Sequence, residues 1–185
     1  MKAFTLLLVI TICTVGLAAC GTDTADTPDT PDEPYDEPPA VSLPDTTGDA
    51  VWAHLGAEDY TASWALWPDK GELYAGTEPH GMLLTTYLNP TAMGGLEGDA
   101  TALPVGSIIV KENYMPDSML AAITVMVKRE VGYNPDHADW FFTKILADGS
   151  VEAMEGMRAE GRVMMCQACH SGRADNDYLM TADIN

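Results

Sequence analysis

Basic residues are scarce in this chain. Its 185 residues include 9 Lys and Arg against 28 Asp and Glu, which gives a formal net charge of −19 at pH 7. Because nucleic-acid binding depends on cationic side chains that neutralise phosphates, this charge argues against a nucleic-acid partner. A solvated acidic surface keeps a protein soluble, and it can also attract a basic redox partner protein.

Long hydrophobic runs are also lacking, apart from one at the N-terminus. The run Ala3–Ala19 follows Lys2 and is too short and wrongly flanked for a membrane span, but it is typical of a signal peptide. It ends in Leu17-Ala18-Ala19-Cys20, which resembles the lipobox of bacterial lipoproteins, where the cysteine is acylated and becomes the new N-terminus. We therefore expect a signal peptide at residues 1–19 and a lipid on Cys20. The lipid would anchor the protein to a membrane of the bacterial cell envelope, on its periplasmic or extracellular face. An ordinary signal peptide with a chance cysteine is the alternative.

Residues 21–49 contain no basic residue, but they contain six prolines and nine acidic residues. Such a composition cannot bury enough apolar surface to offset the entropy lost on ordering. We expect residues 20–49, from the lipidated cysteine onward, to form a disordered tether and residues 50–185 to form one domain. Recognition of the prolines by a partner is the alternative use of this composition.

Cysteines are few, and none is left for a disulfide. Cys13 leaves with the signal peptide and Cys20 takes the lipid, so only Cys166 and Cys169 remain. They belong to Cys166-Gln167-Ala168-Cys169-His170, the pattern of c-type haem attachment.

This motif has the groups that covalent haem attachment needs. Two thiols three residues apart can each add across a vinyl group of one haem, and the adjacent imidazole of His170 can ligate the iron. A CxxC redox pair and half of a zinc site are the alternatives, but a zinc site needs further ligands. Export agrees with haem c, because this haem is attached outside the cytoplasmic membrane in bacteria.

The hydrophobic periodicity of residues 50–185 changes from helical to strand-like. Val51–Trp67 has helical spacing, with Asp49 as N-cap and with a break at Gly56 as an alternative. Strand-like segments bounded by turn residues follow at His80–Leu88, Gly106–Tyr114, Leu120–Lys128, Trp140–Ala147 and, after a turn at Asp148-Gly149, Val151–Met154. Asp175–Ile184 is expected to form a final short helix. The sequence therefore predicts an α+β fold that is mainly β. We expect an antiparallel sheet of about five strands, with helices at the N-terminus and around the C-terminal haem site.

The position of the haem motif after the strands disfavours two familiar helical classes. Small cytochromes c carry the motif near the N-terminus of a helical domain, and cytochromes c′ need four long amphipathic helices. Three stretches instead resemble the cytochrome P460 and cytochrome c′-beta family: Leu103–Tyr114, Ala122–Phe142 and Met164–Met180. The resemblance implies a predominantly β protein with covalently attached haem c, with His170 as the proximal iron ligand and, by analogy, with a homodimeric state.

The resemblance also suggests roles for Lys111 and Thr124. Lys111 matches the lysine that cross-links to haem in the hydroxylamine-oxidising members, and a lysine that reaches solvent at a sheet edge is the alternative. Counted without gaps from Trp140, the distal carboxylate of those members falls on Thr124, and their distal arginine, counted from Pro90, falls on Leu84. Because Thr124 cannot accept a proton near neutral pH, we expect a weakly polar distal pocket that suits a neutral diatomic ligand such as nitric oxide.

A few other residues are candidates for the haem pocket. His80 could be a sixth iron ligand or a distal acid or base, and a structural or surface histidine is the alternative. Met126, on the same strand face as Thr124, is expected in the core, and Met164 and Met165 are expected to pack against the porphyrin.

We therefore expect an extracytoplasmic, lipid-anchored cytochrome with one haem c, which binds nitric oxide or a related small nitrogen ligand at the haem iron. An enzyme that oxidises hydroxylamine or nitric oxide, with Lys111 and Thr124 as site residues, is the first alternative. A six-coordinate electron-transfer cytochrome, with His80, Lys111 or a methionine as second axial ligand, is the other.

Overall fold

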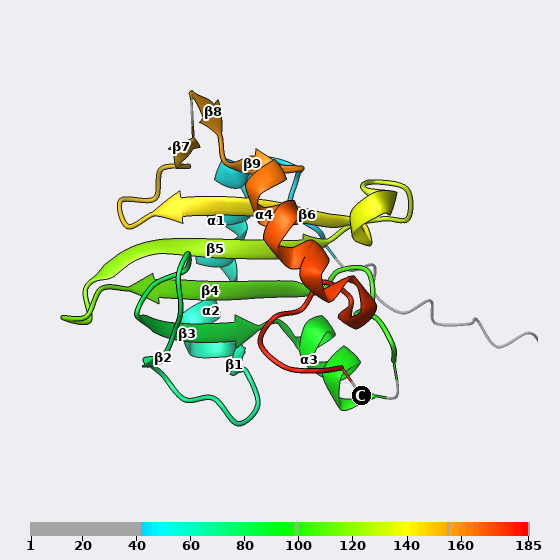
Figure 1. Cartoon of the computed structure of the whole chain (residues 1–185), viewed down its shortest axis with the longest axis horizontal. Coiled ribbons are helices and arrows are strands. Elements are labelled where there is room, and N and C mark those ends of the chain that lie inside the picture. Colours follow the sequence, from blue (N-terminus) through cyan, green and yellow to red (C-terminus); the bar gives the residue numbers. More distant parts are fainter. Residues whose placement is uncertain (1–41, 99, 155, 185) are drawn as a thin grey trace, which may run out of the picture. The chain divides into compact units, whose positions relative to one another are not determined.

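The computed structural model describes residues 42–98, 100–154 and 156–184 of the chain (Figure 1). The expected signal peptide, Cys20 and the tether up to residue 41 lie outside these described residues. Within the described part, no helix is both long and apolar enough to span a membrane. The fold begins before residue 50, because Pro44 and Gly48 are buried and the Pro44 carbonyl accepts a hydrogen bond from Arg129 Nη1 at 2.5 Å.

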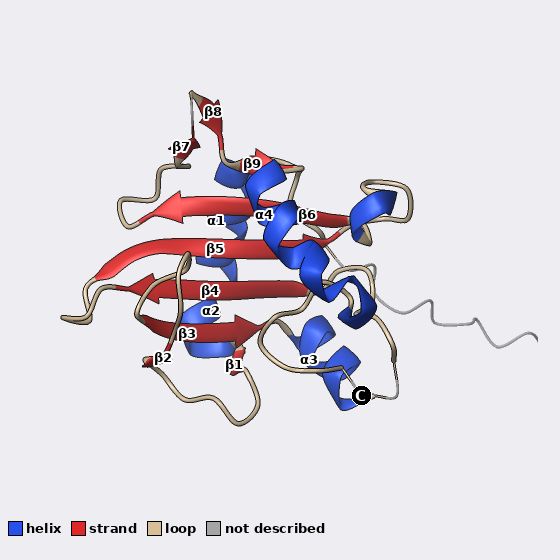
Figure 2. Ribbon diagram, viewed as in Figure 1, coloured by secondary structure: helices blue, strands red, loops and turns tan. Residues whose placement is uncertain are grey.

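A seven-stranded antiparallel sheet is the main element of the fold (Figure 2). Its strand order is β1-β3-β4-β5-β6-β9, and β2 also pairs with β3. The strands are β1 (Ala65–Leu66), β2 (Tyr74–Ala75), β3 (Leu83–Leu88), β4 (Ile108–Tyr114), β5 (Leu120–Lys128), β6 (Trp140–Leu146) and β9 (Glu160–Gly161). The predicted α+β fold with an antiparallel sheet is confirmed, and its additional strands are short ones at the edges.

Helices lie on both faces of this sheet. In Figure 1, α1 (Gly48–Glu58) and α2 (Tyr60–Ser63) lie behind it, and α4 (Met164–His170) crosses its front. A 3₁₀ helix, η2 (Ser171–Asn176), continues from α4. Two connections are also helical: α3 (Pro90–Glu97) joins β3 to β4, and the 3₁₀ helix η1 (Pro135–His137) joins β5 to β6.

Side chains alternate along the long strands and build one apolar core on each face. The core on the α1 side contains Val51, Leu55, Tyr60, Trp64, Tyr87, Ile108, Val110, Ile123, Val125, Val127, Phe141 and Ile145. The core on the α4 side contains Trp67, Leu88, Ala92, Leu103, Ile109, Met126, Trp140, Phe142, Tyr178, Leu179 and Ile184. Lys111 and Thr124 are two residues from Ile109 and Met126 in their strands, so they face the α4 side.

The N-terminal helix differs from the prediction in its cap and in its break. Thr47, rather than Asp49, is the N-cap, and its side chain accepts a hydrogen bond from the Ala50 N–H. The helix ends at Asp59, whose φ of 46° is left-handed, and not at Gly56, which stays helical. Asp tolerates the left-handed region better than most residues, and its own backbone N–H bonds back to the helix end.

Of the four long strands, β5 has the predicted bounds, Leu120–Lys128. The other three end within one residue of the predicted position, but β3 and β4 begin later than predicted. The predicted fifth strand, Val151–Met154, is right only in part. Val151 forms an isolated bridge to Ile145 of β6, and β7 (Ala153–Met154) pairs with β8 (Met157–Arg158) in a separate two-stranded sheet. β9 pairs with Phe142 and Thr143 of β6, so the polypeptide leaves the sheet and returns to it before the haem motif.

The predicted final helix at Asp175–Ile184 is also wrong. Asn176 ends η2, and its side chain holds the following segment in a turn. Asn176 Nδ2 donates to the carbonyls of Leu179 and Ala182, and Asn176 Oδ1 accepts from the Ile184 N–H. These bonds satisfy backbone groups that a helix would have paired internally.

Candidate haem-binding site

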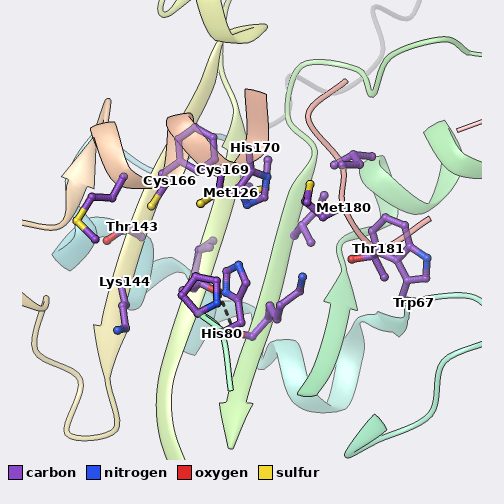
Figure 3. Close-up of a pocket in the computed structure, with 18 residues that line it drawn as sticks. Trp67, His80, Met126, Thr143, Lys144, Cys166, Cys169, His170, Met180 and Thr181 are labelled. Atoms are coloured by element: carbon purple, nitrogen blue, oxygen red, sulfur yellow. Dashed lines mark hydrogen bonds between the residues drawn. The ribbon is translucent and has the colours of Figure 1, made fainter. Parts of the chain in front are cut away.

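A pocket lies between α4 and the strands β4, β5 and β6 (Figure 3). Apolar side chains make up most of its wall. The lining residues from outside α4 include Trp67, Pro79, His80, Ile109, Lys111, Thr124, Met126, Phe142, Lys144, Leu179, Met180 and Thr181. From α4 come Met165, Cys166, Cys169 and His170, so both cysteines and the histidine of the motif face a largely apolar cavity.

His170 is the last residue of α4 and is buried, with 7% of its surface exposed. Its Nδ1 lies 2.7 Å from the Tyr178 carbonyl oxygen. A carbonyl can only accept, so Nδ1 carries the hydrogen and Nε2 keeps its lone pair. Burial lowers the pKa of His170, while the bond to Tyr178 opposes this shift, so the ring is neutral near pH 7 and able to ligate a metal. Phe142 packs against the ring, with 5.4 Å between the centroids.

The Tyr178 carbonyl is held in place by its neighbour Asp177. Both residues have left-handed backbone angles, with φ of 49° and 66°, which residues other than glycine rarely adopt. Lys128 Nζ lies 2.5 Å from Asp177 Oδ1, the Leu103 N–H donates to Asp177 Oδ2 at 2.8 Å, and Trp140 Nε1 donates to the Asp177 carbonyl at 2.9 Å. A buried ion pair and two hydrogen bonds therefore compensate the strain of the turn that orients His170.

Cys166 and Cys169 lie three residues apart on α4, so both reach the same side of the helix. The two thiols form no disulfide with each other. Burial raises the pKa of Cys166 to about 11, whereas a redox-active cysteine has a lowered pKa. A zinc site needs further ligands beside the two cysteines. Among the described residues, no cluster of three or more His, Cys, Asp or Glu side chains could hold a bare metal ion.

The residues present fit a haem. Apolar side chains from the sheet and from the C-terminal segment provide walls for a macrocycle, and two thiols and one imidazole with a free Nε2 converge on the space between them. Cys166 and Cys169 would hold the porphyrin, and His170 would hold the iron.

Lys111 lies in β4 and lines this pocket. Within the described residues it has no carboxylate partner, and burial lowers its pKa to about 8. The interpretation of Lys111 as a solvent-reaching edge lysine does not fit, because β4 is an inner strand between β3 and β5. A cross-link to haem stays a prediction, but the lysine lies where it could reach the group.

Thr124 and His80 lie together in the pocket. Thr124 pairs across the sheet with Lys111 on one side and Lys144 on the other. Its Oγ1 lies 3.2 Å from His80 Nδ1. Burial, with a smaller contribution from nearby Lys111, His170 and Lys144, lowers the pKa of His80 to about 3, so His80 is neutral at pH 7.

Of the other residues considered for the haem pocket, Met126 and Met165 line it, and Leu84 and Met164 do not. Leu84 is buried and borders only an adjoining, more polar pocket. Met126 belongs both to the core and to the pocket wall. Met165 lines the pocket, whereas Met164 is 78% exposed and is not among the lining residues.

The sequence did not predict several parts of the site, among them Phe142, Trp67 and the Tyr178 carbonyl. Phe142, on the α4 face of β6, could have been found from its alternation with Trp140. Trp67 and the Tyr178 carbonyl carried no such signal, because a loop and a left-handed turn place them.

The comparisons with known proteins agree with this site. A sequence profile of the family described as Cytochrome P460 matches residues 63–181. A comparison with curated proteins gives no match. The matched segment is more than half of the chain and contains the sheet, the pocket wall and the Cys-x-x-Cys-His motif. The chain therefore belongs to the cytochrome P460 family and is a haem c-type cytochrome.

Proposed function

We propose that this cytochrome binds nitric oxide or a related small nitrogen ligand at its haem iron. The observation that carries the proposal is the chemistry of the pocket wall: among the described residues that line the pocket between α4 and the sheet, none is Asp or Glu. Such a wall has no anion to attract a cationic ligand and no carboxylate to accept protons from a substrate, and a neutral ligand is compatible with it.

The protein groups have distinct roles in this proposal. Cys166 and Cys169 would hold the porphyrin, because each thiol can add its S–H across one vinyl group. His170 provides the Nε2 lone pair, and Tyr178 keeps the proton on Nδ1. The apolar wall excludes water. When bound, haem supplies an iron centre that takes up diatomic ligands and exchanges electrons.

Oxidation of hydroxylamine is a second candidate function, and Lys111 favours it. Lys111 matches the cross-linking lysine of hydroxylamine-oxidising members and lies in the pocket. Its pKa of about 8 is also close to that of an acid or base that works near neutral pH. The low pKa of His80, about 3, makes that imidazole a weak proton acceptor.

We also propose that a lipid on Cys20 anchors the protein at the periplasmic or extracellular face of the cell envelope, that it meets a basic redox partner, and that it forms homodimers. The signal-like residues 1–19, the acidic composition and the family resemblance support these three proposals in turn. Fractionation of cells that produce the wild-type protein and the Cys20→Ala variant tests the anchor. The variant should move from the membrane to the soluble fraction.

The ligand proposal is tested by titrating the haem-loaded protein with nitric oxide. Binding of one nitric oxide per haem, followed by absorption spectroscopy in the ferrous and ferric states, is the expected result. Turnover of hydroxylamine with an artificial electron acceptor is measured on the same preparation. Failure to bind nitric oxide in both oxidation states would overturn the proposal, and turnover without stable binding would favour the second candidate.

A further inference from the structure

We propose that His80 is the second axial ligand of the haem iron, so that an incoming ligand must displace it. The coordination depends only on the haem site, whereas the displacement by nitric oxide rests on the proposed function.

The separation of the two histidine rings fits one metal ion between them. His80 and His170 both line the pocket, and their ring centroids are 6.2 Å apart. A metal–imidazole bond is about 2.0–2.1 Å long, so a metal ion bound by two imidazoles spans roughly 4 Å between their nitrogens. The rest of the separation corresponds to the two ring radii. The ring planes differ by 89°, which coordination permits because each ring can turn about its own bond to the metal.

The contact of His80 with Thr124 is made by Nδ1 and so leaves Nε2 for a metal ion. Thr124 Oγ1 lies 3.2 Å from His80 Nδ1, and it lies 3.4 Å both from the Lys111 carbonyl oxygen and from Asn113 Nδ2. When the Thr124 hydroxyl hydrogen points to the Lys111 carbonyl, Thr124 accepts from His80, so Nδ1 carries the hydrogen and Nε2 keeps its lone pair, as in His170.

His80 and His170 thus share one arrangement. In both residues Nδ1 lies within hydrogen-bond distance of an oxygen, the Thr124 hydroxyl in one case and the Tyr178 carbonyl in the other. This is the arrangement by which proteins orient ligating histidines. Thr124 is then a positioning residue, at the position where the family resemblance, counted without gaps from Trp140, expects a distal carboxylate.

A compact turn places His80 in the pocket. The His80 N–H bonds to the Thr77 carbonyl at 3.2 Å, and the Gly76 N–H bonds to the Met82 carbonyl at 2.9 Å. A Cβ at Gly76 would lie 2.3 Å from the Gly81 carbonyl oxygen, so the two arms of the turn touch. The turn positions His80 without embedding it in the sheet.

The ring also has space to leave. The adjoining pocket is lined by Lys70, Tyr74 and Glu78, and His80 borders both cavities. This polar pocket can receive a displaced, solvated imidazole. A ligand that arrives at the iron would therefore exchange with His80 rather than enter an open site.

The test uses the haem-loaded protein and its His80→Ala variant, with His54→Ala as matched control because His54 lies on α1, across the sheet from the pocket. Electron paramagnetic resonance of the ferric wild type should show a low-spin iron. In His80→Ala the low-spin signal should be replaced by a high-spin signal, and added imidazole should restore the low-spin signal. In His54→Ala the iron should stay low-spin. Circular dichroism verifies that each variant is folded.

Nitric oxide kinetics give a second measurement. The binding rate of the wild type should level off at high nitric oxide, because His80 must first dissociate, whereas the rate of His80→Ala should rise in proportion to concentration. A high-spin wild type, or a low-spin His80→Ala variant without added imidazole, would overturn the axial role of His80. If the spin-state change occurs but neither protein binds nitric oxide, the axial role stands and the proposed function fails.

Discussion

Replacing Asp177 by Asn should destabilise the protein and disturb the proximal histidine together. The Asp177 side chain is 2% exposed and its partner Lys128 is 9% exposed, so the change leaves a buried cation without its anion. Removing one partner of a buried ion pair costs about 3–5 kcal/mol. Asn keeps an oxygen for the Leu103 N–H, and Lys128 stays 4.8 Å from the centre of the Trp140 ring, so we expect the lower end, about 3 kcal/mol.

The haem site should change as well, because Asp177 directly precedes Tyr178, whose carbonyl orients His170. A turn that relaxes from its left-handed angles weakens the bond from His170 Nδ1 to Tyr178, and the imidazole becomes a poorer electron donor. The reduction potential of the haem should therefore rise in Asp177→Asn.

Urea unfolding of the haem-loaded protein measures the first effect and a redox titration the second. Asp183→Asn is the matched control, because Asp183 pairs with Arg173 but is 80% exposed, and we expect no measurable change there. Adding Lys128→Met to Asp177→Asn should recover most of the lost stability, since it removes the unpaired charge. If Asp177→Asn unfolds at the same urea concentration as Asp183→Asn, the buried pair does not have the role given to it here.

Three further predictions follow from single positions. Gly56→Ala should stabilise the protein by about 0.5–1 kcal/mol, because Gly56 is helical and a Cβ there meets nothing within 4 Å; Gly48→Ala should destabilise it, because its Cβ would lie 2.4 Å from Val151 Cγ2. Thermal unfolding compares the two, and equal shifts would contradict the packing around Gly48. If Lys111 is bonded to haem, peptide mapping of the denatured wild type should recover a lysine–haem peptide that Lys111→Arg lacks; identical maps would remove the cross-link. If Lys111 is not bonded, its pKa, lowered by burial from 10.5 to about 8, means that the unfolded chain binds the proton more tightly. The free energy of unfolding should then rise between pH 8 and pH 10.5 by about 3 kcal/mol, at 1.36 kcal/mol per pKa unit, and Lys111→Met should not show this rise.

The strands were predictable where an apolar, β-branched run is bounded by turn residues. Leu120–Lys128 is such a run, so the sequence alone predicts its bounds, and the two-residue period of a strand places Thr124 on the face of Ala122 and Met126. The segment Val151–Met154 has strand-like residues too, but only Val151 bridges to β6, and β9 pairs with Phe142 and Thr143 of the same strand. Local composition does not indicate how two segments share one edge of a sheet.

The candidate site was predictable only in part. The motif identifies Cys166, Cys169 and His170, because attachment chemistry requires their spacing. The oxygen that orients His170 is a backbone carbonyl, placed by an ion pair between residues 49 positions apart. The sequence offered His80 as an axial candidate, but only the packing of its turn brings the ring near His170.

The division of the apolar residues between two cores has a consequence for biogenesis. The core on the α1 side is closed by protein alone, whereas the core on the α4 side borders the cavity that the haem would fill. A newly made chain without haem would therefore be closed on the α1 side and open on the α4 side. Proteases cleave loosely packed segments first, so they would distinguish haem-free from haem-loaded molecules by the α4 side alone. Haem binding would in this way also determine which copies of the protein escape degradation.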